Sequence, residues 1–320
     1  MIPMSLREQV SLLVFGAALL AVYGAEIGLW IGYLLNRFHR RRPGKILLAK
    51  AAIVVHVLAA IGLLAFLYGY FIEPCWIDVN VVPIRTTKLA SATFRIVHIS
   101  DLHVDTTPRN EEAAVRIING LEPDLIVVTG DFLNDAGAVP RLKGMLGRLE
   151  APLGKLAVAG NFEQYYWPDM DLLAGTGFRL LERETVVAAK GSESLGVFGM
   201  GYVPSDHLGE PLEDLPADRF NLFLFHTPDL VEDLSEQGID LYLCGHTHGG
   251  QVAMPLYGAL ITFSKFGKKY ESGMYQVGDT VLYVNRGLGM EPRPAPQMRF
   301  FARPEITVFD IQPELLQDGR

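Results

Sequence analysis

Cysteine, basic residues and low-complexity sequence are all scarce in this chain, and each scarcity excludes a class of protein. Two cysteines, Cys75 and Cys244, among 320 residues are too few for a disulfide framework. Acidic residues outnumber basic ones by 36 to 28, so the chain lacks the broad basic surface that nucleic-acid binding requires. No internal repeat is present, and a hydrophobic fraction of 49% excludes wholesale disorder. We therefore expect a folded protein with no nucleic-acid partner.

Charge is distributed unevenly along the chain. The first 72 residues hold seven basic and two acidic residues, a net charge of +5. The other 248 residues carry 21 basic and 34 acidic residues, a net charge of −13. Mean hydropathy of +0.22 is high for a soluble domain. We therefore expect three parts: an N-terminal segment of residues 1–72, a linker of residues 73–93, and one globular domain of residues 94–320.

Two apolar segments in the N-terminal part predict a transmembrane helical hairpin. Between Gln9 and Asn36 the only charged residue is Glu26, and residues 51–72 hold no acidic or basic residue except the usually neutral His56. About 20 apolar residues span a bilayer as a helix. The alternative, a signal peptide followed by a buried helix, would show a shorter apolar core of about 7–15 residues.

The loop between these segments, NRFHRRRPGK, predicts the orientation of the hairpin. It holds four arginines and Lys45, and Pro43 and Gly44 supply the turn. The positive-inside tendency places such a loop in the cytoplasm, so the acidic domain is expected on the opposite side of the membrane.

Glu26 and His56 are polar residues at membrane depth. Both fall at a similar level when counted outward from the turn, so they could bond to each other across the hairpin. Alternatively, each faces a neighbouring subunit or extends toward the membrane surface.

The acidic part alternates apolar β-type runs with helical stretches. Residues 94–100, 124–129 and 156–159 predict strands, with helices between them near residues 110–121 and 140–149. The intervals from Asp101 to Asp131 and from Asp131 to Asn161 are both 30 residues, which fits one βαβ unit each. The second half is rich in short strands with one helix, expected at residues 228–238. The pattern favours a layered α/β domain with a mixed β sandwich inside.

Polar residues follow several of these predicted strands. Because the carboxyl ends of parallel strands meet at one edge of a sheet, we expect these side chains to converge. A ligand set of carboxylates, imidazoles and an amide, with no thiolate, suits Mn, Fe or Zn. In Asp-x-His and His-x-His, residues two apart on a strand point the same way and can approach one metal cluster. The set comprises Asp101, His103, Asp131, Asn161, His226, His246 and His248.

The order Asp-x-His, Gly-Asp, Gly-Asn-x-Glu, His and Gly-His-x-His resembles the calcineurin-like metallophosphoesterase superfamily, in particular its membrane-anchored bacterial members. The resemblance spans residues 94–311 and implies a four-layer αββα sandwich behind the hairpin. It also implies two divalent metal ions that lower the pKa of a shared water, which then attacks phosphorus. By position, Asp101, His103 and His248 would bind the first ion, Asn161, His226 and His246 the second, and Asp131 would bridge them. Asp131, Asn161 and His226 would then be catalytic.

One position departs from the family pattern. The family usually has Gly-Asn-His at the third motif, and that histidine protonates the leaving group. This chain has Phe162 there. Three explanations are open: Glu163, Tyr165 or Tyr166 supplies the proton, the leaving group departs without one, or catalysis is impaired.

The sequence thus predicts a membrane-anchored, two-metal hydrolase of phosphodiester or phosphoanhydride bonds in small-molecule or lipid-linked substrates. The alternative is a catalytically impaired protein of the same fold that serves as a membrane sensor or binding module. Substrate-binding residues, the identity of the metals and the oligomeric state do not follow from the sequence.

Overall fold

The computed structural model describes residues 4–39, 49–203 and 215–314. The chain divides into two units, one of residues 4–72 and one that begins at Glu73. The turn predicted at Pro43 and Gly44 lies outside the described residues.

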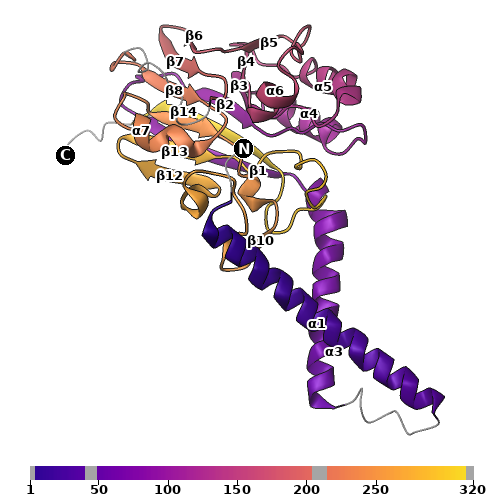
Figure 1. Ribbon diagram of the computed structural model, residues 1–320. Helices are drawn as coiled ribbons and strands as arrows, with labels where there is room; N and C mark the ends of the chain where they lie inside the picture. Colours follow the sequence, from indigo (N-terminus) through magenta and orange to yellow (C-terminus); the bar gives the residue numbers. More distant parts are fainter. Residues whose placement is uncertain (1–3, 40–48, 204–214, 315–320) are drawn as a thin grey trace. The chain divides into compact units, whose positions relative to one another are not determined.

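The first unit consists of two long apolar helices, α1 (Leu6–Phe38) and α3 (Lys50–Leu67), which pack against each other (Figure 1). Ser5 caps the start of α1 through a capping box with Glu8. A π-helical turn, Tyr68–Ile72, extends α3. Both helices are long and apolar enough to cross a membrane, as the sequence predicted.

The contact between Glu26 and His56, one of the two arrangements that the sequence left open, is present in this hairpin. His56 Nδ1 lies 2.6 Å from Glu26 Oε2. Trp30 Nε1 donates a second hydrogen bond, of 2.8 Å, to the other oxygen of Glu26. The hairpin therefore satisfies its polar side chains internally, which lowers the cost of placing them among lipid tails.

The second unit is a sandwich of two six-stranded sheets (Figure 1). In the first sheet β2, β3, β4 and β5 are parallel neighbours, and β14 and β1 extend it beyond β2. In the second sheet β13, β9, β8 and β7 are parallel, with β12 and β6 antiparallel at the edges. The first sheet contains β1 (Asp78–Thr86), β14 (Glu305–Pro313), β2 (Phe94–Ile99), β3 (Leu125–Thr129), β4 (Lys155–Val158) and β5 (Phe178–Leu180); the second contains β12 (Gly273–Val277), β13 (Thr280–Val284), β9 (Leu241–Cys244), β8 (Phe220–Leu224), β7 (Glu193–Gly199) and β6 (Glu184–Lys190).

Alternation along the buried strands creates the layers. On β2, Phe94 and Ile96 join the core between the two sheets, whereas Val97 and Ile99 join the core under the helices. A third apolar cluster covers the outer face of the second sheet. The four-layer αββα architecture is therefore confirmed. The helices are α4 (Glu111–Gly120), α5 (Val139–Leu146), α6 (Asn161–Tyr166) and α7 (Val231–Leu234), and a short strand pair joins β10 (Ala253–Met254) to β11 (Gly258–Ala259).

Two expectations differ from the structure. Residues 73–93, expected as a linker, contain β1, which pairs in parallel with the whole of β14. Half-buried and exposed side chains alternate along β1, as in an edge strand, and an isolated edge strand carries too little apolar sequence to stand out. The helix expected at residues 228–238 is shorter, a 3₁₀ turn at Pro228–Leu230 followed by α7, and Gly238 adopts a φ of 76° beyond it.

Candidate metal centre

The seven polar residues predicted from the sequence all lie where strands end. Asp101, Asp131 and Asn161 follow the adjacent parallel strands β2, β3 and β4 of the first sheet. The histidines of the second sheet follow the neighbouring strands β8 and β9. The sandwich therefore brings the polar ends of both sheets to one place. These histidines are His226, His246 and His248.

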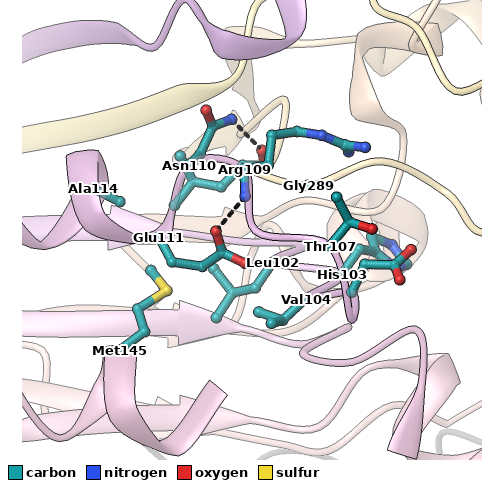
Figure 2. A pocket seen from close by; sticks show the side chains of 12 residues that line it. Leu102, His103, Val104, Thr107, Arg109, Asn110, Glu111, Ala114, Met145 and Gly289 are labelled. Atoms are coloured by element: carbon teal, nitrogen blue, oxygen red, sulfur yellow. Dashed lines mark hydrogen bonds between the residues drawn. The ribbon is translucent and has the colours of Figure 1, made fainter. Parts of the chain in front are cut away.

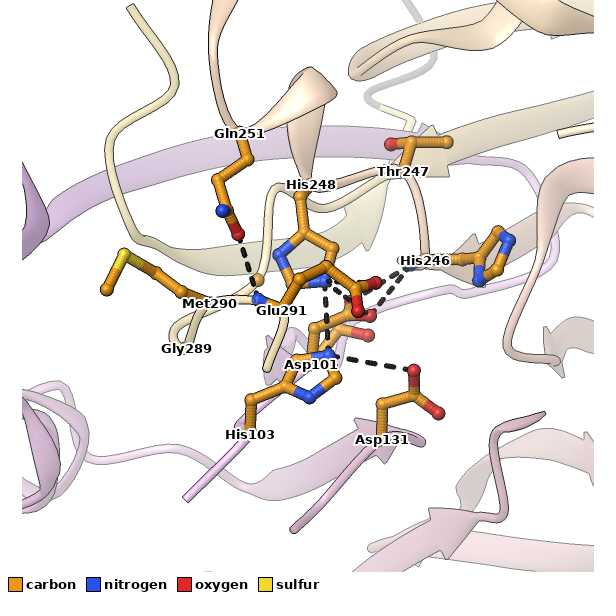
Figure 3. Close-up of polar contacts among 12 residues, drawn as sticks. Asp101, His103, Asp131, His246, Thr247, His248, Gln251, Gly289, Met290 and Glu291 are labelled. Carbon is orange, nitrogen blue, oxygen red and sulfur yellow. Dashed lines mark hydrogen bonds and ion pairs between the residues drawn. The ribbon is translucent and has the colours of Figure 1, made fainter. Parts of the chain in front are cut away.

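The first group of side chains consists of Asp101, His103 and His248. One ligand atom from each lies within 4.8 Å of the others, and all three residues are buried. His248 Nε2 lies 3.5 Å from Asp101 Oδ1 and 3.2 Å from His103 Nε2 (Figure 3). Three such donors around one point can hold a divalent cation.

The second group consists of Asp131, His226 and His246, again with ligand atoms within 4.8 Å of one another. His226 Nε2 lies 3.3 Å from Asp131 Oδ2 and 3.1 Å from His246 Nδ1. The amide oxygen of Asn161 joins this group at 2.9 Å from His226 Nε2.

Asp131 lies between the two groups. Its Oδ1 accepts a hydrogen bond from the backbone N–H of Phe162. Its Oδ2 is buried and has no hydrogen-bond partner among the described residues, and it lies 3.6 Å from His103 Nε2 and 3.3 Å from His226 Nε2. A buried carboxylate oxygen without a donor is costly unless a cation meets it. The residues present therefore fit a pair of metal ions.

Backbone conformation explains the convergence better than strand periodicity does. Asp101, His103 and Asp131 have φ values of 47°, 39° and 54°, in the left-handed region. His246 and His248 share this conformation, with φ of 70° and 52°. Non-glycine residues rarely adopt it, and a cluster of them is typical of a functional site. Asp101 and His103 converge as expected, but not because they share one face of a strand. That reason is wrong, because β2 ends at Ile99.

Close backbone approach at the site requires glycine. A Cβ atom at Gly245 would lie 2.0 Å from Asp101 Oδ2, and one at Gly160 would lie 2.2 Å from Asp131 Oδ1. Both contacts are far shorter than van der Waals distance, so larger residues there would displace the aspartates.

Hydrogen bonds outside the two groups orient the imidazoles. His103 Nδ1 lies 2.6 Å from Asn134 Oδ1, and His226 Nδ1 lies 2.7 Å from the Thr129 carbonyl. Carbonyl oxygens only accept, so these Nδ1 atoms carry a proton, and each Nε2 is the nitrogen that could bind a metal. His246 is reversed, because its Nε2 faces the Phe263 carbonyl at 3.1 Å. Asn134 was not identified from the sequence, since an asparagine in a loop carries no distinguishing signal.

Electrostatics couple the carboxylates to one histidine. Burial alone would lower the pKa of His226, but Asp131 and Asp101 outweigh it and raise that pKa to about 10. Without a cation this imidazole therefore also carries a proton on Nε2, which a bound ion would displace. Burial raises the pKa of Asp101 to about 6, with His226 opposing the rise. Burial and the neighbouring His226 lower the pKa of His246 to about 4, which keeps this imidazole neutral, as a metal ligand must be.

Comparison with known proteins identifies the family. The family model described as calcineurin-like phosphoesterase matches residues 94–250. The uncharacterized metallophosphoesterase YkuE of Bacillus subtilis (strain 168) is 34% identical over 77% of this chain and 90% of its own length. Phosphodiesterase YaeI of Escherichia coli (strain K12) is 28% identical over 77% of this chain and 92% of its own. The UDP-2,3-diacylglucosamine pyrophosphatase LpxG of Chlamydia muridarum is 26% identical over 78% and 94%.

The chain belongs to the calcineurin-like metallophosphoesterases. It is accordingly a hydrolase of phosphoester bonds that uses divalent metal, and its two apolar helices associate it with a membrane.

The third motif of this metallophosphoesterase has a structural glutamate beside its phenylalanine. Glu163 is buried, and its carboxylate accepts hydrogen bonds of 2.8 Å from the backbone N–H groups of Asp131, Phe132 and Gly160. Both of its oxygens are thus committed to holding two metal-site loops together. This arrangement argues against Glu163 as the replacement acid.

Phe162 forms part of the wall beside the first group. It is buried, and its ring meets the edge of the His103 ring with centroids 4.8 Å apart. The Tyr166 ring also packs against it, with centroids 5.1 Å apart, and Tyr165 lies near Tyr202, whose ring contacts His226. Both Tyr165 and Tyr166 are exposed, so a proton donor at this motif would be one of these phenols.

A small pocket borders the first group at His103 (Figure 2). Leu102, Val104, Ala114 and Met145 line its apolar part, and Asp105, Thr107 and Glu111 are among the polar residues of the rest. Arg109 lies at this pocket, and no described residue bonds its guanidinium. The metallophosphoesterase site thus has a recess of mixed polarity next to one of its two groups, with the guanidinium of Arg109 at it.

Proposed function

We propose that this chain is a membrane-anchored phosphoesterase with two divalent metal ions, Mn, Fe or Zn, which hydrolyses phosphodiester or phosphoanhydride bonds in lipid-linked substrates. Asp101, His103 and His248 would hold the first ion. Asn161, His226 and His246 would hold the second, with Asp131 between them.

The unpartnered oxygen of Asp131 is the observation that supports this proposal most strongly. A lone metal would need only one of the two groups, whereas Asp131 Oδ2 faces imidazole nitrogens of both at 3.6 and 3.3 Å. A carboxylate in this position can bridge two cations.

The residues around the two proposed ions would bind the substrate and hold the site in place. When bound, the two ions supply an activated water and neutralise charge on the phosphoryl oxygens. Asn161 directs its amide oxygen at the second group, and no described residue bonds its amide nitrogen, which can donate to a phosphoryl oxygen. Glu163 fixes the loops that carry Asp131 and Asn161, so the site is organised before substrate binds.

Phe162 and the membrane anchor favour a particular class of substrate. Phenylalanine donates no proton, and phosphate anhydrides or aryl phosphates leave without one more readily than alkoxides do. The apolar part of the recess, at Leu102, Val104 and Met145, is suited to an aliphatic part of a lipid-linked molecule. The LpxG relatives are named for a pyrophosphatase reaction on a diacylated nucleotide sugar, which is an anhydride of this kind.

Turnover of a soluble aryl diester tests the proposal. The full chain in detergent should hydrolyse bis(p-nitrophenyl) phosphate when Mn²⁺ is added. Asp131→Asn should reduce kcat by about 10³-fold or more, because it removes the bridging charge. Asp279→Asn, on an exposed turn between β12 and β13, makes the same change in charge and should keep full activity. If no divalent ion supports turnover, the proposal is wrong and the membrane-sensor alternative takes its place.

Labelling of Cys75 tests the orientation of the anchor. The arginine-rich loop predicts that the second unit, which begins at Glu73 and which we call the catalytic unit, lies on the non-cytoplasmic side. Cys75 is exposed at the start of that unit, whereas Cys244 is buried. A membrane-impermeant maleimide should therefore label Cys75 in intact cells, and Cys75→Ser should abolish the label. Labelling only after the cells are opened would reverse the orientation.

A further inference from the structure

Glu291 directs a carboxylate at the first group of metal ligands, although it belongs to none of the sequence motifs. Its Oε1 lies 3.8 Å from His248 Nε2 (Figure 3). Two atoms that each lie about 2.1 Å from one ion are at most about 4.2 Å apart. The distance from Glu291 to His248 is within that limit, as are those from His248 to Asp101 and to His103, of 3.5 and 3.2 Å.

The backbone that carries Glu291 is fixed to the metal site. Gln251 Oε1 accepts the N–H of Glu291 at 2.9 Å, and Asn134 Nδ2 donates to the Met290 carbonyl at 3.0 Å. Gly289 N–H donates to the Asp101 carbonyl at 2.8 Å. Three successive residues are thus bonded to metal-site loops, and Asn134 also holds His103. Glu291 is therefore held in place by the site rather than by a separate loop.

The carboxylate of Glu291 has no donor of its own. Across residues 4–39, 49–203 and 215–314, His248 is the only polar partner of its carboxylate, and its side chain is only 23% exposed. The carboxylates of Asp131 and Asp101 lie near enough to repel its charge. A partly buried carboxylate beside two others is unfavourable unless a cation lies among them.

We propose, on the basis of the two-metal function above, that Glu291 is an additional ligand of the first metal ion. The first ion then has oxygen donors from Asp101, Asp131 and Glu291 as well as two imidazoles. Five protein ligands exceed the four of a tetrahedral zinc site and suit Mn²⁺ or Fe²⁺. The third carboxylate therefore determines which metal the first position prefers.

Binding of Mn²⁺ to the full chain in detergent tests this assignment without reference to activity. The electron paramagnetic resonance signal of free Mn²⁺ gives the number of bound ions and their Kd values. The wild-type chain should bind two ions. Glu291→Gln, which keeps the shape and removes the charge, should weaken one of them by about tenfold or more and leave the other unchanged. Glu291→Asp, which retracts the carboxylate by one methylene, should give an intermediate loss.

Controls separate this inference from the function on which it rests. Glu236→Gln removes one exposed carboxylate and should leave both Kd values unchanged. Competition should show that Glu291→Gln shifts the ratio of the Mn²⁺ and Zn²⁺ affinities of the first site further toward Zn²⁺ than in the wild type. If Glu291→Gln binds both Mn²⁺ ions as the wild type does, Glu291 is not a ligand, whatever its effect on turnover. If the wild-type chain itself binds fewer than two ions, the two-metal function fails instead.

Discussion

The hairpin and the catalytic unit each place histidine beside a carboxylate, but only in the hairpin are both carboxylate oxygens hydrogen-bonded. In the hairpin, Glu26 receives His56 on one oxygen and Trp30 on the other, at 2.6 and 2.8 Å, so its carboxylate is satisfied. In the catalytic unit, Asp131 Oδ2 approaches His103 and His226 and still has no hydrogen-bond partner among the described residues. The same chemical groups make a closed pair in one unit and an incomplete site in the other.

Geometry accounts for the difference. Two packed helices bring one polar residue from each to a common level. Two such side chains can satisfy each other without a further partner. Two stacked sheets bring the ends of several strands together, so many ligands meet at one place. His98 offers a third case, since it is buried in the catalytic unit with a hydroxyl partner in place of a carboxylate.

The largest expected effect is on the free energy of unfolding, and it comes from the buried imidazole of His98. Burial lowers its pKa to about 3, with Glu305 opposing the shift. The folded chain thus keeps His98 neutral while an unfolded chain binds a proton below about pH 6.5. Its contribution to stability is complete above pH 6.5 and is lost as pH falls toward 3, on the order of 4 kcal/mol in all.

His98→Gln tests this contribution because glutamine donates to Thr129 without titrating. Thr129 Oγ1 itself donates to Ser100, so it accepts from His98 Nε2 at 2.8 Å. Denaturant unfolding of the two chains between pH 7 and pH 4 should show a steeper loss in the wild type. Parallel curves would mean that His98 is already protonated in the fold or lies outside the cooperative unit.

The next effect concerns Phe162, which leaves the metal centre without the family's usual proton donor. In the wild type, aryl diesters should react far faster than dialkyl diesters. Phe162→His should lower the ratio of aryl to dialkyl rates by about 10²-fold, at the lower end of what general acid catalysis contributes. Ratios of kcat/KM for the two substrates measure it, with Phe162→Gln as a polar control. Equal wild-type rates on both substrates would contradict the missing-acid argument.

The smallest effect concerns the closed pair in the hairpin. Glu26→Gln and His56→Ala should show a coupling energy of about 0.6 kcal/mol in a double-mutant cycle of hairpin stability, the average for hydrogen bonds within membranes. Turnover of the soluble diester should not change in either variant. Independent effects of the two substitutions would show that the pair makes no energetic contribution in the membrane.

The sequence predicted the parts of this protein that depend on local patterns. Thirty-residue spacing placed Asp101, Asp131 and Asn161 after adjacent parallel strands, as the structure has them. The four-layer sandwich and the two apolar helices were also predicted correctly. These features follow from strand periodicity, segment length and the order of the motifs.

Features that depend on long-range packing were not predictable in the same way. The edge strand β1 was expected as a linker, because only its pairing with β14 defines it. Glu291 is 43 residues beyond His248 and reaches the site through long-range contacts of residues 289–291 with Asp101, Asn134 and Gln251. Glu163 was considered as a proton donor, and only its three backbone contacts reveal that it holds the loops together.

The central claim is that two metal ions lie on either side of Asp131, and anomalous scattering from crystals soaked in Mn²⁺ tests it most directly. The account predicts two peaks about 3.5–4 Å apart. One should lie beside Asp101, His103 and His248, and the other beside Asn161, His226 and His246. A single peak, or none at these residues, would contradict it.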